Sequence, residues 1–161
     1  MSRIDNEVRI TPSVLDRLLD DRPEEKREAP ASRQANLRIL KQSVKRDLEW
    51  LLNTRSNATE IPEDLPELHR SLATFGIPDF SSWNVRGGGD QEQLRKMIED
   101  AVTRFEPRLE GVQVSLEIMS ELDRTVRFRI DARLRVEPAP EPVTFDSVLQ
   151  LANREFVLQG S

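Results

Sequence analysis

Two long stretches of the chain carry apolar residues at the three- and four-residue spacing of a helix with one buried face. The first covers residues 32–55, where leucine and valine recur at this spacing. The second covers residues 90–105, and Pro107 should end it, because proline lacks a backbone donor and disfavours helix at Glu106. A shorter helix is expected over 66–74, with Leu68 and Leu72 pointing inward.

A short amphipathic helix is predicted ahead of these two, over residues 12–20. Its apolar stripe includes Leu15, Leu18 and Leu19. About ten residues do not hold a lone helix in water, so the stripe must dock on its own domain or on a partner. Charged and proline-containing residues 22–32 follow, a composition typical of a linker.

The period changes to two in the last third of the chain, as in strands with one buried face. Apolar and polar residues alternate over 112–118 and again over 126–136, and two further strands are expected over 143–151 and 156–158. Helices first and strands last predict the α+β class. We expect a leader helix and linker over 1–31. One compact domain over 32–161 should then pack its helices on a small antiparallel or mixed sheet.

Composition narrows the range of functions for these 161 residues. The net charge of −5 argues against nucleic acid, which needs a basic face to neutralise phosphates. The absence of cysteine removes disulfides, thiolate catalysis and zinc–thiolate sites. No stretch reaches the roughly 20 apolar residues of a membrane helix, and the N-terminus has no signal-peptide core. The sequence predicts a soluble, cytoplasmic protein without direct membrane insertion.

Candidate catalytic groups are sparse. The single histidine, His69, does not make a metal site, and the glycines at 87–89 lack the Gly-Lys-Ser/Thr ending of a phosphate loop. Paired carboxylates could serve a glycosidase, but 29 acids in the chain make any pair uninformative. We therefore expect no catalytic residue, no metal and no cofactor.

Two polar features suggest contact with other molecules. Four arginines on one side of the 126–136 strand form either a solvated face balanced by cross-strand acids or a docking surface for an acidic partner; they are Arg127, Arg129, Arg133 and Arg135. A strand of about twelve residues would be twice the common length, and its edge could accept a strand from another protein.

The second feature is the junction formed by Glu106, Pro107 and Arg108. In an extended segment residues two apart project to one side, so the acid and the base share a side of a rigid corner. Arg108 is suited to bidentate contacts that lysine does not copy. The corner is either an internal salt bridge that fastens the helix to the first strand, or a contact site for a partner.

Three motifs in order, LLNTR, FGIPDF and EPRL, together with the leader RITPSVLDRLLDD, resemble one family. It is the lysozyme-like baseplate wedge-protein family of contractile phage tails, whose type VI secretion member is TssE. The resemblance covers nearly the whole chain, and the linker, the triple glycine and the last ten residues match least well.

The resemblance implies a cytoplasmic baseplate component that needs no enzymatic activity. It implies a wedge complex with TssF and TssG, a link to TssK, and a role where the sheath of TssB and TssC begins to polymerise. With it, partner contact becomes the favoured reading of the corner at 106–108, and the leader helix becomes a detachable anchor. A lysozyme-like peptidoglycan hydrolase and an adapter protein that uses the same fold are the alternatives.

Overall fold

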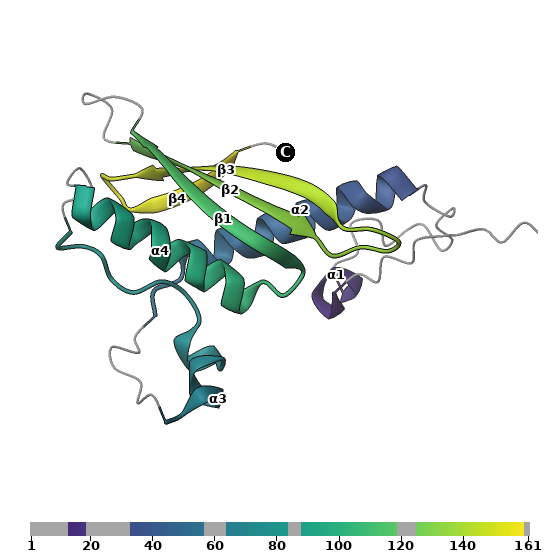
Figure 1. Cartoon of the computed structure of the whole chain (residues 1–161), viewed down its shortest axis with the longest axis horizontal. Helices are drawn as coiled ribbons and strands as arrows, with labels where there is room; N and C mark the ends of the chain where they lie inside the picture. The colour runs from purple at the N-terminus through teal and green to yellow at the C-terminus, as the bar shows by residue number, and fades with distance from the viewer. Residues whose placement is uncertain (1–12, 19–32, 57–63, 84–87, 119–124, 160–161) are drawn as a thin grey trace, which may run out of the picture.

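The computed structural model describes residues 13–18, 33–56, 64–83, 88–118 and 125–159. Figure 1 shows the helices on one side of a twisted sheet. The helical elements are α1 (Val14–Leu18), α2 (Arg33–Asn53), α3 (Pro66–His69), the 3-10 turn η1 (Leu72–Thr74) and α4 (Gly88–Phe105). The strands are β1 (Leu109–Ile118), β2 (Thr125–Leu134), β3 (Glu141–Gln150) and β4 (Glu155–Gln159).

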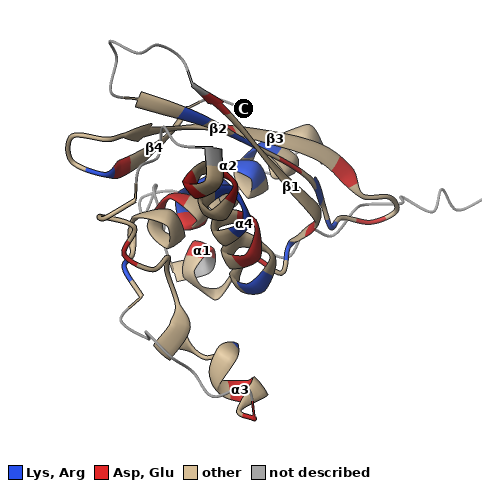
Figure 2. Cartoon of the chain, turned by 60° about the vertical axis from the view of Figure 1, so that its left-hand side comes forward, with Lys and Arg blue, Asp and Glu red and all other residues tan. Residues whose placement is uncertain are grey.

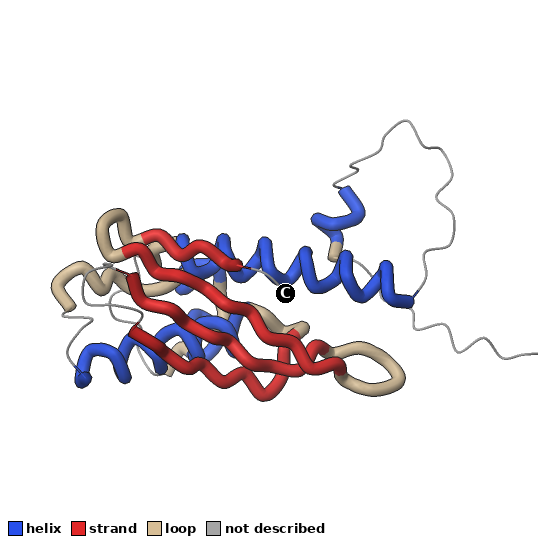
Figure 3. Tube along the Cα trace, turned by 90° about the horizontal axis from the view of Figure 1, so that it is seen from above, coloured by secondary structure: helices blue, strands red, loops and turns tan. Residues whose placement is uncertain are grey.

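The four strands form one antiparallel sheet in the order β1-β2-β3-β4. This arrangement confirms the α+β class and shows that the sheet is wholly antiparallel. Seen from above, the two long helices lie only partly beneath the sheet, and α2 extends beyond it (Figure 3); α4 contacts β1 and α2 contacts β4. None of the described helices is long and apolar enough to cross a membrane.

The core lies between the sheet and the two long helices, as the two periodicities predict. Every second residue of β2 from Val126 to Leu134 is buried, and α2 and α4 contribute the residues of their apolar stripes. The innermost residues include Val44, Leu48, Leu94, Ile98, Phe128, Ile130 and Phe145.

A tight turn at Gly76 attaches the segment after η1 to the end of α2. Gly76 has φ +102°, and a Cβ there would lie 2.4 Å from the Thr54 carbonyl oxygen, so only glycine fits. The Ile77 N–H donates to the Thr54 carbonyl at 2.9 Å, and the Ser56 N–H donates to the Ile77 carbonyl at 3.0 Å. The turn buries Ile77 and Phe80 in the core.

Several details differ from the sequence expectations. The first helix begins at Val14, after Ser13 and Asp16 exchange hydrogen bonds in the manner of a capping box. Pro12, where the sequence predicts the helix to begin, lies outside the described residues, as does the linker over 22–32. Leu68 and Leu72 are 36% and 85% exposed, because α3 and η1 stand away from the core instead of packing on it (Figure 1).

The strand that carries the arginine row is also placed differently from the prediction. It ends at Leu134, has ten residues, and is paired on both sides, with β1 and with β3. Its edge is therefore occupied, and the outer strands of the sheet are β1 and β4. Arg135 lies just past the strand, where its N–H donates to the Arg108 carbonyl at 2.8 Å.

Candidate functional site

The corner at residues 106–108 is a tight turn between α4 and β1. The Glu106 N–H donates to the Val102 carbonyl at 2.9 Å and so completes the helix, and the Leu109 N–H donates to the Glu106 carbonyl at 3.1 Å. Pro107 is exposed at the apex. The helix therefore ends where proline predicts, and the chain reverses within three residues.

Arg108 and Glu106 form a two-bond fork inside this turn. Arg108 Nε donates to Glu106 Oε1 at 2.7 Å, and Arg108 Nη2 donates to Glu106 Oε2. The backbone N–H of Arg108 donates to Oε1 as well, at 3.2 Å. Glu106 is only 4% exposed. Water therefore does little to solvate its carboxylate, and these hydrogen-bond donors stabilise the negative charge instead.

The same guanidinium reaches α2. Arg108 Nη1 donates to Ser43 Oγ at 3.0 Å, and Nη2 donates to Asp47 Oδ2. Burial works to lower the pKa of Arg108, but the carboxylates of Glu106 and Asp47 outweigh it and raise the pKa above its ordinary value. The corner is thus an internal clamp that holds α4, β1 and α2 together, although the Arg108 side chain is still 24% exposed.

The network continues from α2 to the leader helix α1. Ser43 Oγ donates to Asp16 Oδ2 at 2.7 Å, and Arg46 Nη2 donates to Asp16 Oδ1 at 2.8 Å. Arg46 also pairs with Asp47, at 2.9 Å. Burial tends to raise the pKa of Asp16, but hydrogen bonds from Ser43, Ser13 and Arg46 lower it well below its usual range.

Sequence reasoning did not find Asp16, Ser43, Arg46 or Asp47 as members of this network. A partial signal is present, since Ser43 and Asp47 are four residues apart and share one side of α2. The contacts themselves join residues from 27 to 65 positions apart, and no local pattern records that distance.

The apolar stripe of α1 does not face the domain. Val14 and Leu18 are 74% and 76% exposed, and Leu15 is 37% exposed; Leu19 lies outside the described residues. The leader helix is therefore attached through its polar side, by Asp16, while its apolar side faces away from the core.

Three arginines of the predicted row have acidic neighbours across the sheet. Arg129 Nε lies 3.2 Å from Asp146 Oδ1, and Arg133 and Arg135 lie 3.4 and 3.6 Å from the Glu110 carboxylate. Arg127 is half-buried, and within the described residues its buried Nε has no hydrogen-bond partner. In Figure 2 basic and acidic positions are interspersed. A docking role for this row stays a prediction.

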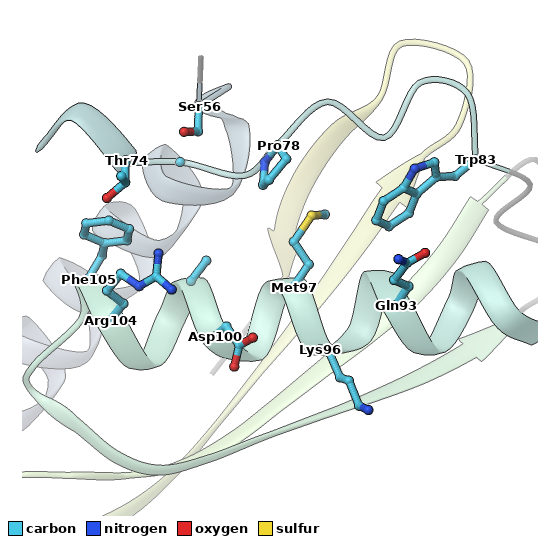
Figure 4. A pocket seen from close by; sticks show the side chains of 12 residues that line it. Ser56, Thr74, Pro78, Trp83, Gln93, Lys96, Met97, Asp100, Arg104 and Phe105 are labelled. Carbon is cyan, nitrogen blue, oxygen red and sulfur yellow. The ribbon is translucent and has the colours of Figure 1, made fainter. Parts of the chain in front are cut away.

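A surface hollow of about 370 Å³ lies between α4 and the segment after η1 (Figure 4). Its walls include Trp83, Met97 and Phe105, with Lys96, Asp100 and Arg104 around them. Asp100 is the single carboxylate among the lining residues, whereas glycoside hydrolysis uses two. Among the described residues, no group of histidine, cysteine and acidic side chains could hold a metal ion.

Fold and site together define a small α+β protein in which a network of polar and charged side chains joins α1, α2 and the corner between α4 and β1. A model of the family described as "Baseplate wedge protein gp25" matches residues 38–139, more than half of the chain. The chain belongs to this family, and its role is that of a structural component of a baseplate. The match includes most of α2, the corner, β1 and β2.

A solved structure described as "The baseplate complex from the type VI secretion system" contains a similar chain. The two are 20% identical, with a TM-score of 0.48, and the similarity covers 69% of this chain and 94% of that one. No curated protein matches the chain in sequence.

Proposed function

We propose that the chain is a structural part of the baseplate of a type VI secretion machine in the cytoplasm, and that it acts without an active site of its own. Family membership supports the baseplate role, and the motifs LLNTR, FGIPDF and EPRL support the type VI assignment. By the same resemblance, its partners are the wedge proteins TssF and TssG, then TssK, and the sheath proteins TssB and TssC.

The observation that carries this proposal is the preorganised corner. Arg108 is held by acceptors on Glu106, Ser43 and Asp47, yet its side chain is 24% exposed beside the exposed Pro107. An arginine that is already fixed loses little conformational entropy when a partner binds it. The internal clamp and a partner contact are therefore compatible, and we place the wedge proteins at this corner.

We assign the apolar side of α1, the arginine row and the sheet to other contacts in the same assembly. The exposed Leu15 and Leu18 of α1, with Leu19, would form an apolar anchor on a partner, because an apolar helical stripe is stabilised by burial. Arg127, Arg129, Arg133 and Arg135 would meet acidic side chains of a neighbour. The sheet would pair its backbone with strands of the sheath.

The test is co-purification of the chain with TssF and TssG, comparing the wild type with Arg108→Lys. Lysine keeps the charge but loses the planar fork, so we expect weaker retention of the wedge proteins with the fold intact by circular dichroism. Arg104→Lys is the matched control, since Arg104 is exposed on α4 and precedes the corner. Equal retention of both variants and the wild type would remove the corner from the interface.

A further inference from the structure

A carboxylate site formed by Ser43 and Arg46 lies on α2 beside the corner, and the leader helix fills it. Asp16 Oδ2 accepts from Ser43 Oγ at 2.7 Å, and Asp16 Oδ1 accepts from Arg46 Nη2 at 2.8 Å. Each oxygen of the carboxylate therefore has its own donor on α2, a hydroxyl in one case and a guanidinium in the other. The Asp16 side chain is 9% exposed, so the site holds the carboxylate largely out of water.

Contacts within the domain position both donors of the carboxylate site. Ser43 is 5% exposed, and its oxygen accepts from Arg108 Nη1 at 3.0 Å. A hydroxyl has a single proton, and the proton of Ser43 is directed at the leader. Arg46 is anchored by two bonds to Asp47 Oδ1, at 3.0 and 2.9 Å, and its guanidinium lies 5.5 Å from the centre of the Trp50 ring. The site is therefore preorganised on α2.

The leader helix is a weakly attached occupant of this site. Helix α1 has five residues, too few to hold a helix in water without docking. Its apolar side chains add little to the attachment, because Val14 and Leu18 are 74% and 76% exposed. Asp16 supplies the hydrogen bonds to α2. A carboxylate from another chain would therefore compete with Asp16 for the same two donors, and it would restore both bonds once the leader had left.

We propose that Ser43 and Arg46 form a carboxylate receptor, which Asp16 occupies in the isolated chain and an acidic side chain of the wedge partner occupies in the assembly. The inference rests on the proposed function, because Ser43 is bonded to Arg108 of the corner. The leader shows which acid fits. Asp16 follows the capping Ser13 by three residues, so the receptor takes an acid in the first turn of a helix. The exchange releases the leader and its apolar stripe.

An NMR titration of the full chain tests the receptor without a partner. The receiving protein is Asp16→Ala, which leaves the site vacant, and the probe is a synthetic peptide of residues 10–21 that retains Asp16. We expect the Arg46 Nε–H and Ser43 amide signals to shift when the peptide is added at millimolar concentration. The same peptide with Asp16→Asn should bind on the order of tenfold more weakly, because it loses hydrogen bonds to a charged group. No shift with either peptide, or equal binding by both, would overturn the receptor.

Co-purification with TssF and TssG tests whether a partner's acid takes the place of Asp16. Asp16→Ala and Arg46→Gln both remove the ion pair between Asp16 and Arg46, so both should release the leader, which faster amide exchange over Val14–Leu18 would show. Arg46→Gln also damages the receptor. We therefore expect Asp16→Ala to retain more of the wedge proteins than the wild type, and Arg46→Gln to show no such gain. Arg38→Gln, at an exposed position on α2, is the control and should match the wild type.

The remaining outcomes separate this inference from the proposed function. If Asp16→Ala and Arg46→Gln raise retention alike, the released apolar stripe accounts for the gain, and the partner's acid at the receptor is overturned. If Asp16→Ala retains no more than the wild type, the exchange is overturned as well. If the wild type and every variant fail to retain TssF and TssG, the proposed function fails together with the partner's acid, whereas the peptide titration still shows whether Ser43 and Arg46 bind a carboxylate.

Discussion

Removing the guanidinium of Arg108 should expose how much the corner stabilises the fold. In Arg108→Ala the carboxylate of Glu106, a residue that is 4% exposed in the wild type, keeps only the backbone N–H of residue 108 as a donor. Breaking a buried ion pair costs about 3–5 kcal/mol. The Arg108 side chain is 24% exposed, so water would reach part of the space it leaves. We expect a loss near the lower end, about 3 kcal/mol in the free energy of unfolding.

A double-mutant cycle separates two effects of Arg108→Ala: the loss of the ion pair with Glu106, and the cost of leaving the Glu106 carboxylate buried without a charged partner. Glu106→Gln in the Arg108→Ala background removes the uncompensated carboxylate, so the double variant should be more stable than the sum of the single effects predicts. We expect a coupling energy of about 1–2 kcal/mol, within the range for residues in direct contact. Arg108→Lys should lie between wild type and Arg108→Ala, because it keeps the charge and loses the fork.

Urea unfolding followed by circular dichroism measures the wild type, the two single variants of the cycle, the double variant and Arg108→Lys. The slope of the free energy against urea should stay the same while the midpoint falls. Arg104→Ala is the control for losing an arginine near the end of α4, and it should stay within about 0.5 kcal/mol of wild type. An Arg108→Ala protein equal in stability to this control, with no coupling to Glu106, would refute the clamp.

Three other substitutions test the parts of the chain around the corner. Asp16→Ala should release α1 from α2 and speed amide exchange over Val14–Leu18. In the wild type the pKa of Asp16 is lowered by folding. The attachment of α1 should therefore be complete above the ordinary carboxyl pKa of about 3.9 and weaken as the pH falls below that value. Gly76→Ala should cost at least about 2 kcal/mol in urea unfolding, because its Cβ would meet the Thr54 carbonyl at 2.4 Å and φ is +102°. Leu18→Asp should leave the unfolding midpoint unchanged, since Leu18 is 76% exposed, yet reduce co-purification with TssF and TssG; Ile39→Asp, at a 51% exposed site on α2, is its control.

The sequence predicted well the helices and strands that bury one apolar face in the core. The stripes of α2 and α4 and the alternation along β2 appear in the structure because their apolar residues are the ones that fill the core. Pro107 predicted the end of α4, since a missing N–H is a local property of the chain. The α+β class followed from the order of these elements.

The features that the sequence did not reveal depend on contacts between distant residues. Asn53 meets Phe156, and Glu99 meets Val114, through side chain to backbone bonds that leave no periodic trace. The inner position of β2 agrees with its place in the chain, because few residues separate it from β1 and from β3, and consecutive strands usually pair. The polar attachment of the leader helix also leaves no local signal, because Asp16 meets Ser43 and Arg46, which lie 27 and 30 positions away; docking of its apolar stripe on a partner stays a prediction.

The corner and the leader helix are parts of one hydrogen-bonded network, and this affects how both serve an assembly. Ser43 Oγ accepts from Arg108 and donates to Asp16, so the same hydroxyl connects the corner to α1. Asp47 adds a second route, because it pairs with both Arg108 and Arg46. A partner that draws Arg108 outward would therefore disturb the acceptors that position Ser43 and Arg46, and with them the hold on Asp16. The wedge contact and the release of the apolar leader stripe are thus expected to favour each other, because neither can change without altering hydrogen bonds of the other.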